Sequence, residues 1–262
     1  MEDEIFYLMH KNIIVASLKI SDNGQAILIH KAEDNIKHFP IGGSLNNSKF
    51  ADWWKNRYIP EKRDGLKKAL ENAGYESTSC ALIKNLALSL TDCYWIRPRN
   101  SDLKWEDVNL FSNDFNDPIG EGQFNSKAKV KIKKNKYDVG SSSGELKKKW
   151  FIDIDGKRVL VKGNFGNSFQ QSLNEIFISN IHQQLGTKYL LKYELIKMKD
   201  ENGISIAACK CDNFCNENTE FVSALEIIDS KKLKGSTNPF NLFREGCIEL
   251  GIKVGQTHEI LK

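Results

Sequence analysis

Gly140-Ser141-Ser142-Ser143-Gly144 opens the stretch of sequence that decides the fold, and Trp150-Phe151-Ile152-Asp153-Ile154-Asp155-Gly156-Lys157-Arg158-Val159-Leu160-Val161-Lys162 continues it. Aromatic and β-branched residues flank Asp155-Gly156, so this run predicts two strands joined by a tight turn. The second strand ends on Lys162, directly before Gly163. The stretch therefore predicts a flexible loop, a β-hairpin and a lysine at the end of a strand.

A helix that carries Glu175 is predicted to follow the hairpin. Asn167 or Ser168 can cap its start, and Gly186 is a residue type that ends helices. Glu175 lies at the border of an apolar stripe, from where its carboxylate can reach a neighbouring sheet and meet the Lys162 ammonium. We expect the stripe itself to be buried; its members are Leu173, Phe177 and Ile181, widened by Ile176, Ile178 and Leu185.

A Ser/Gly loop, two strands, a lysine and a helix with an acid, in this order, are the parts of a kinase-type lobe that binds ATP. Backbone N–H groups of the loop can surround phosphate groups, and Lys162 can contact them. Glu175 can hold the lysine in place, since a partly buried ion pair is better evidence of positioning than of stability. The alternative is a solvated helix glutamate and an exposed lysine, which either residue taken alone would favour. The loop candidates are Ser141, Ser142, Ser143 and Gly144.

A second hairpin is predicted after the helix, from Lys188–Lys199 and Gly203–Phe214, because Asn202-Gly203 is a favoured hairpin turn. In a kinase-type lobe this hairpin leads into the hinge, where backbone groups hold adenine. The hinge candidates are Lys210, Cys211 and Asp212. Thr219–Ile228 and Asn241–Lys253 are expected to be mainly helical.

The first 115 residues predict an α+β module of their own. Ile5–Ile20 alternates and ends in the turn signal Ser21-Asp22-Asn23-Gly24, after which Gln25–His30 follows as a second strand. Asn100–Asn125 is rich in polar residues and predicts an extended connection to the lobe. Between these segments we expect helices at Lys49–Arg57, from Arg63 to Gly74 and from Ser77 or Thr78 to about Leu86, then a short strand or ordered loop at Ser89–Pro98.

Composition and charge are those of an ordinary globular protein. Of the 262 residues, 40% are apolar and 27% are charged, and the formal charge of +4 is too mild to indicate nucleic acid by itself. No apolar run approaches the roughly 20 residues that a membrane-spanning helix needs. Met1-Glu2-Asp3-Glu4 lacks the basic start of a signal peptide. These features predict a cytoplasmic protein that does not bind membranes.

Two groups of residues leave alternatives open. Cys209, Cys211 and Cys215 have a C-x-C-x3-C spacing, but no fourth ligand stands at a familiar zinc spacing, so reduced thiols are favoured over a metal site. Lysines alternate with apolar residues over Lys127–Lys136, which favours an edge strand or a solvated segment. An electrostatic contact with an anionic partner is the alternative there. Direct nucleic-acid binding is not expected, because only Tyr137 is close enough for base stacking.

Several short segments, spread over nearly the whole chain, carry a family resemblance. They are Leu8-Met9-His10-Lys11-Asn12, Ser89-Leu90-Thr91-Asp92-Cys93-Tyr94-Trp95-Ile96-Arg97-Pro98, Trp105-Glu106-Asp107-Val108-Asn109, Leu146-Lys147-Lys148-Lys149-Trp150, Lys162-Gly163 and Asn174-Glu175. Together they resemble the HipA-like serine/threonine kinases of bacterial toxin–antitoxin systems, and most closely HipA-related proteins of Gram-positive bacteria and their mobile elements. The resemblance implies a phosphate loop at Ser142, Ser143 and Gly144, a phosphate-binding role for Lys162 and a supporting role for Glu175.

The C-terminal part departs from the pattern of that family. Such a kinase needs an Asp that orients the substrate hydroxyl, and an Asn and a further Asp that hold Mg²⁺. Asp229 is the only aspartate after Cys215, and Lys234 stands where the Asn should be. We therefore expect no catalytic residue here, and Mg²⁺ only together with a missing second lobe. The chain is then a fragment of a longer kinase, a natural partial protein completed by another chain, or a regulatory protein that contacts a partner such as an antitoxin.

The expected fold is α+β. A small sheet with helices should occupy residues 1–115, and a nucleotide-binding lobe with a five-strand-type antiparallel sheet and one main helix should occupy 116–215. Residues 216–262 should form the helical start of a second lobe. If the rest of that lobe is missing, these helices should expose apolar side chains.

Overall fold

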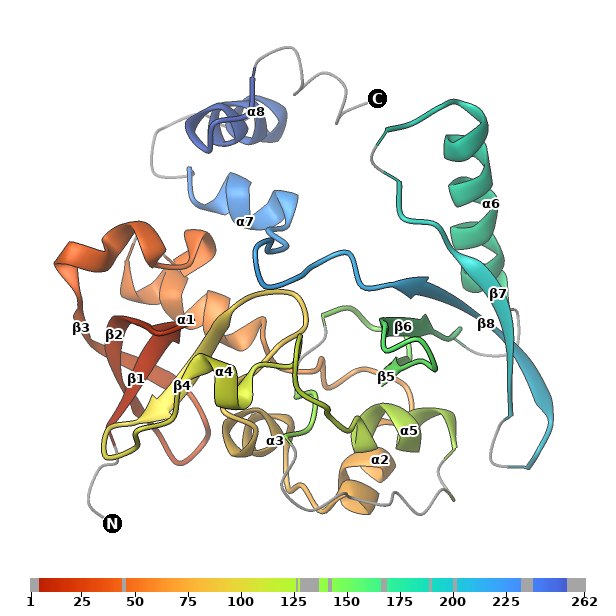
Figure 1. The fold of residues 1–262 in the computed structure, drawn as a ribbon, viewed down its shortest axis with the longest axis horizontal. Coiled ribbons are helices and arrows are strands. Elements are labelled where there is room, and N and C mark those ends of the chain that lie inside the picture. The colour runs from red at the N-terminus through yellow and green to blue at the C-terminus, as the bar shows by residue number, and fades with distance from the viewer. Residues whose placement is uncertain are drawn as a thin grey trace.

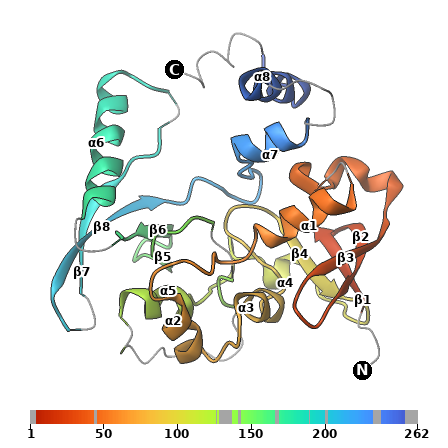
Figure 2. The ribbon, with the colours of Figure 1, turned by 180° about the vertical axis from the view of Figure 1, so that it is seen from behind.

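The computed structural model describes residues 5–43, 46–125, 127, 137–140, 143–165, 169–188, 190–199, 202–231 and 238–253. The chain has an α+β fold with two four-stranded antiparallel sheets (Figure 1). The N-terminal sheet lies on one side of the molecule, and the second sheet extends to the opposite side. Figure 2 shows the same arrangement from behind.

The N-terminal sheet has the strand order β3-β2-β1-β4. Its strands are β1 (Ile5–His10), β2 (Ile13–Ile20), β3 (Ala26–Lys31) and β4 (Tyr94–Pro98). The prediction of one strand over Ile5–Ile20 is wrong, because the chain turns at Lys11, which has a φ of 51°. A turn of Lys11 and Asn12 lacks the glycine that marks most tight hairpins, so the alternation alone did not reveal it.

The helices predicted for the N-terminal module are confirmed. They are α1 (Asn47–Lys55), α2 (Leu66–Ala73) and α3 (Thr78–Lys84), and two short 3₁₀ helices, η1 (Glu33–His38) and η2 (Ile41–Gly43), precede them. Gly74 ends α2 in the left-handed conformation, as its position predicted. The Ser77 side chain accepts a hydrogen bond from Cys80 N and caps α3. Phe50, Trp53 and Trp54 form the buried side of α1.

The stretch from 100 to 125 is not the extended connection that its composition predicted. It contains α4 (Trp105–Val108) and α5 (Pro118–Phe124), and Trp105, Ile119 and Phe124 are buried. Some of its polar side chains form hydrogen bonds with nearby backbone groups. For example, Asp117 accepts a hydrogen bond from Gly120 N at 2.8 Å and caps α5. Short polar side chains serve caps and turns as readily as linkers, so composition could not distinguish the two. α5 packs against α2 and β5.

The second sheet has the strand order β5-β6-β8-β7, and both predicted hairpins are present. Its strands are β5 (Lys148–Ile152), β6 (Arg158–Lys162), β7 (Glu194–Lys199) and β8 (Ser205–Asp212). The described residues supply four strands to this sheet where five were predicted. The predicted edge strand Lys127–Lys136 lies outside the described residues except for Lys127. Val161 and Ala208 face Phe124 of α5, in a buried cluster of their own.

The helix after β6 forms, but of its predicted buried stripe only Ile176 packs against the core. α6 (Gln170–Gln184) ends at Leu185 and Gly186 as expected, whereas the proposed caps Asn167 and Ser168 lie outside the described residues. Phe177 is 63% exposed, and Leu173, Ile178, Ile181 and Leu185 are exposed as well. The side turned to the sheet carries the buried Ser172 and Ser179. Periodicity located an apolar face, but tertiary hydrogen bonds to the serines turned the opposite face inward.

The last two helices expose apolar side chains, as expected for the C-terminal part. α7 (Ala224–Asp229) packs against α8 (Pro239–Glu249). Leu225 is 59% exposed, and Phe240, Ile248 and Leu250 are exposed too. The main buried cluster contains residues of both sheets, among them Trp95 and Leu160. Within the described residues, no helix combines the length and the apolar character needed to cross a bilayer.

Candidate functional site

Lys162 and Glu175, which the sequence predicted to meet, are in contact. The Lys162 Nζ at the end of β6 lies 2.7 Å from Glu175 Oε1 on α6. The Tyr193 hydroxyl lies 2.6 Å from the same nitrogen, and the centroid of the Tyr193 ring lies 4.6 Å away. The Lys162 side chain retains 19% exposure, so an anion can still reach its ammonium.

The surroundings of Lys162 favour its charged form. Burial by itself lowers the pKa of the ammonium, but the hydrogen bonds to Glu175 and Tyr193 outweigh burial and raise that pKa above its usual value. Burial also raises the pKa of the Tyr193 hydroxyl to about 12, although Lys162 opposes this shift. At neutral pH the site therefore presents a cation held by a carboxylate and a neutral phenol.

Polar bonds set the position of α6, and with it the position of Glu175. The Asn164 side chain accepts a hydrogen bond from Ser172 N at 2.8 Å and donates one to Ala207 O at 2.7 Å. Further along the helix, the Ser179 hydroxyl accepts a hydrogen bond from Tyr193 N at 3.1 Å. Since Ser172 and Ser179 flank Glu175 on the inward side, these bonds hold the carboxylate at the level of the Lys162 ammonium.

The Ser/Gly loop is fixed by an arginine from the N-terminal module. The buried Arg63 guanidinium donates to Gly144 O, at 2.7 Å from Nη2 and 3.1 Å from Nε, and Nη2 lies 3.4 Å from Ser143 O. Burial lowers the pKa of Arg63 to about 10, while the Asp117 carboxylate opposes that shift. Ser143 and Gly144 are exposed, and the candidates Ser141 and Ser142 lie outside the described residues. Arg63 therefore holds the C-terminal half of the loop near the lysine.

Lys148 is a second lysine of the site, which the sequence had shown only as part of a basic run. Its ammonium donates to Ser143 O, and a Cβ at Gly144 would lie 2.7 Å from Lys148 Nζ. Gly144 has a φ of +85°, so glycine suits both its conformation and this close approach. A Cβ at Gly163, which follows Lys162, would lie 2.9 Å from the Phe124 ring. Glycine thus allows tight packing at both ends of the site.

The three hinge candidates lie at the end of β8 and differ in their surroundings. Lys210 Nζ lies 3.4 Å from Glu194, an Asp212 oxygen lies 3.2 Å from Lys157 Nζ, and Cys211 is buried. Asn213 N donates to Arg158 O at 2.7 Å, which fixes the direction of hydrogen bonding between β8 and β6. In an antiparallel pair, successive residues point their backbone N–H and C=O groups alternately toward and away from the partner strand. The N–H and C=O of Asp212 therefore face away from β6, on the side of β7. The pairing of β7 with β8 ends at Glu194 and Lys210, before it reaches Asp212. Asp212 therefore offers the backbone groups best placed to bind a ligand.

A groove of about 770 Å³ lies beside the loop. Ser143 and Gly144 form one part of its wall, Asn56–Lys62 another and residues from Phe221 to Asp229 a third. The lining drawn from the described residues does not include Lys148, Lys162 or the hinge candidates. Side chains of both charge signs line the groove, so its electrostatics favour no particular class of ligand.

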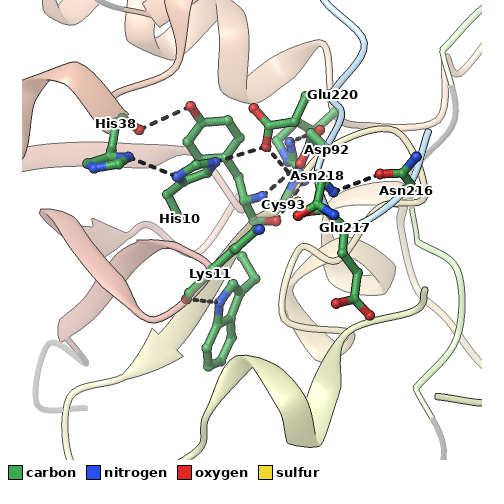
Figure 3. Close-up of polar contacts among 12 residues, drawn as sticks. His10, Lys11, His38, Asp92, Cys93, Asn216, Glu217, Asn218 and Glu220 are labelled. Atoms are coloured by element: carbon green, nitrogen blue, oxygen red, sulfur yellow. Dashed lines mark hydrogen bonds and ion pairs between the residues drawn. The ribbon is translucent and has the colours of Figure 1, made fainter. Parts of the chain in front are cut away.

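The segment after β8 is clamped to the N-terminal sheet (Figure 3). Glu220 Oε1 accepts a hydrogen bond from Cys93 N at 2.7 Å and lies 3.1 Å from His10 Nε2. His10 Nδ1 in turn lies 3.3 Å from His38 Nδ1. We call His10, His38, Cys93 and Glu220 the clamp. It joins residues that are far apart in the sequence and holds the chain that follows β8 against β1 and the start of β4.

Both titratable ends of the clamp have a lowered pKa. Burial lowers the pKa of His38 below 6.5, with help from His10 and Lys37, although Glu220 raises it. Burial would raise the pKa of Glu220, but hydrogen bonds from His10 and Cys93 N outweigh it, so the net shift is downward. In both cases the unfolded chain binds more protons than the folded chain as the pH falls.

We expect the clamp to make the protein less stable in acid. Stability should fall as the pH drops below 6.5, the unfolded value for His38, and again below 4.5, the unfolded value for Glu220. Urea unfolding midpoints at about pH 7.5, 5.5 and 4 measure both losses. His38→Gln should remove the first loss and leave the second. Burial raises the pKa of Asp117, which stabilises the folded chain in acid and opposes the loss from the clamp. Equal changes in midpoint for wild type and His38→Gln between the two higher pH values would therefore contradict this expectation.

The sequence did not reveal Arg63, Tyr193 or the clamp as parts of a site. Arg63 stood only at the start of a predicted helix, and Tyr193 only within the predicted strand Lys188–Lys199, of which the structure forms β7 from Glu194 onward. Nothing local marks either one, because each acts through a contact with a distant segment. The cysteines of the C-x-C-x3-C group do not add to the site. Cys209 and Cys211 lie in β8, as predicted, and the six thiols form no disulfide.

Comparison with protein-family models found none that matches the chain, and comparison with curated proteins found no match. Function is therefore inferred from the residues and contacts described above.

Proposed function

We propose that this chain carries the ATP-binding lobe of a HipA-like serine/threonine protein kinase and acts in the bacterial cytoplasm. Lys162 contacts the phosphate groups, Glu175 holds that lysine, and the Ser/Gly loop, which includes Ser143 and Gly144, covers the phosphates. The backbone of Asp212 takes the edge of the adenine. The 2.7 Å contact between Lys162 Nζ and Glu175 Oε1 is the observation that carries the proposal.

Three further features support it. The alternative of an exposed lysine and a solvated glutamate fits poorly with side chains that are 19% and 34% exposed and share an ion pair. Ser143 and Gly144 are bound to Arg63 through their carbonyls, so these bonds do not occupy the N–H groups with which the two residues would bind an anion. The order of loop, hairpin, lysine, helix and second hairpin matches that of a kinase lobe.

The proposal assigns binding to this chain and no phosphoryl transfer. Transfer requires the developing negative charge to be neutralised, usually by metal ions held on carboxylates. Among the described residues, no group of three or more His, Cys, Asp or Glu side chains is placed to hold a metal ion. The proposal therefore names no residue that holds Mg²⁺ and no catalytic residue.

Calorimetric titration with ATP and Mg²⁺ tests the proposal. We expect the wild-type chain to bind ATP and Lys162→Ala to bind it at least about tenfold more weakly, a loss of about 1.4 kcal/mol. The reason is that the variant loses the cation that faces the phosphate groups. Glu175→Gln should weaken binding less, because the lysine keeps its charge and loses only part of its support.

A matched control separates this effect from a general loss of charge. Lys199→Ala removes an exposed lysine from β7 of the same sheet and should leave ATP affinity unchanged. Circular dichroism of each variant checks that the fold is retained. No binding by a folded wild-type chain would reject the proposal in its present form.

A second candidate is a non-catalytic interaction protein of a toxin–antitoxin or mobile-element system. The apolar side chains exposed on α6, α7 and α8 favour it, because large exposed apolar patches commonly mark protein interfaces. A complementary kinase half or an antitoxin would suit such a surface. A folded chain that binds no ATP would support this candidate. A downstream reading frame with Asp-x-x-x-x-Asn and a further Asp would favour the kinase.

A further inference from the structure

Lys148 and Lys162 lie directly opposite one another on neighbouring strands. The register of β5 and β6 pairs them, so both side chains leave the same face of the sheet. Like charges in this position destabilise a sheet. The adjacent Lys147 and Lys149 each have an acidic partner, Asp64 and Glu121 respectively. At the centre of the candidate site, two facing lysines share the single carboxylate of Glu175, which is paired with Lys162, and this arrangement calls for a functional explanation.

The charges around Lys148 leave a surplus of positive charge. Among the described residues, Arg63 and Lys162 are the cations that act on its ammonium, and Glu175, already paired with Lys162, is the carboxylate that opposes them. The contact of the Lys148 ammonium is a backbone carbonyl, Ser143 O, in the loop predicted to cover phosphates. A neutral carbonyl is a weaker acceptor for an ammonium than an anionic oxygen.

We propose that Lys148 is a second phosphate-binding cation, which exchanges its contact with the Ser143 carbonyl for one with a phosphate oxygen when ATP binds. The inference rests on the proposed function and deepens it. Lys162 is paired with Glu175, so its charge offsets only part of the negative charge of the triphosphate. The Lys148 ammonium would offset a further part of it.

Proton uptake is a consequence of this arrangement. Burial, together with Arg63 and Lys162, lowers the pKa of Lys148 to about 8, although Glu175 opposes the shift. An anion placed against the ammonium raises that pKa again. At about pH 8.5, above the second ionisation of phosphate, binding of ATP should therefore take up a fraction of one proton.

Calorimetry on three proteins tests the inference: wild type, Lys148→Met and Lys149→Met. Methionine keeps the apolar stem and removes the charge. At about pH 7, Lys148→Met should bind ATP about tenfold more weakly and AMP with less than about a twofold change. Lys149→Met should bind both like wild type, because Lys149 points to Glu121 on the other face of the sheet. Titrations of the wild type at the higher pH, in buffers of different ionisation enthalpy, measure the proton uptake.

The outcomes separate this inference from the proposed function. Wild-type affinity for ATP in a folded Lys148→Met variant would overturn the role of Lys148 and leave the nucleotide lobe in place. Absence of proton uptake by the wild type would also overturn it, even if the variant did not fold. A wild-type chain that binds no ATP would remove both proposals together.

Discussion

Arg57→Met is expected to lower the free energy of unfolding by about 3–5 kcal/mol, because it removes one member of a buried ion pair. The Arg57 side chain is 5% exposed and donates to Asp92 Oδ2 at 2.7 Å. It also donates to Ala87 O at 2.6 Å and to Tyr94 O at 3.2 Å. Methionine would leave all three acceptors without this donor. Ala87 has a φ of 54°, so the lost bond also supported a strained backbone.

Urea unfolding followed by tryptophan fluorescence measures this loss. The matched control is Lys55→Met, which changes an exposed lysine at the end of α1, two residues before Arg57, and should change stability by less than about 0.5 kcal/mol. Asp92→Asn and the double variant complete a cycle that isolates the contribution of the ion pair. Equal midpoints for Arg57→Met and Lys55→Met would show that the buried guanidinium is not needed.

Arg63→Met should lower the free energy of unfolding by about 2–4 kcal/mol and loosen the Ser/Gly loop. The guanidinium is 3% exposed, and its bonds to Gly144 O and Ser143 O tie the N-terminal module to the loop. Loss of a buried charged donor leaves Gly144 O without its Arg63 donors, and among the described residues it leaves Lys149 as the remaining cation that acts on the Asp117 carboxylate. Amide hydrogen exchange should increase in peptides that cover residues 143–149.

The neighbouring Lys62 provides the control for this variant. It is exposed, and Lys62→Met should leave both stability and exchange of the loop unchanged. Arg63→Lys should recover only part of the stability, because an ammonium cannot reproduce the forked geometry of the guanidinium. If exchange in the loop is the same in wild type and Arg63→Met, the loop is held by something other than Arg63.

How far the sequence predicted the site can be judged from α6. Lys162 and Glu175 were found because each lies at a position marked by a local signal, the end of a hairpin strand and the middle of a periodic helix. The same periodicity assigned the wrong face to the interior. Leu173 and Phe177 are exposed, while Ser172 and Ser179 are buried through bonds to Asn164 and Tyr193. A periodic pattern records which face is apolar, but not which face has a partner.

The segment from 100 to 125 shows the same limit for the fold. Its polar residues predicted a connection, yet Asp117 caps α5 and accepts a hydrogen bond from Trp150 N at 2.8 Å, which links α5 to β5. Burial raises the pKa of Asp117 to about 6. The composition of the segment is the same whether its carboxylates meet water or backbone amides, so only the tertiary structure distinguishes the two.

The sequence by itself determined the α+β class, both hairpins of the second sheet, the helices α1, α2 and α3, and the meeting of Lys162 with Glu175. These depend on turn residues, caps and short-range periodicity, whose physical effects act within a few positions of the chain. Only the tertiary structure decided that Arg63 holds the loop, that Lys148 faces Lys162, and that His10 and Glu220 join the two ends of the fold. Those contacts form between segments far apart in the sequence. Helix, strand and turn preferences act over a few residues, so they do not indicate which distant residue will become a contact in the folded chain.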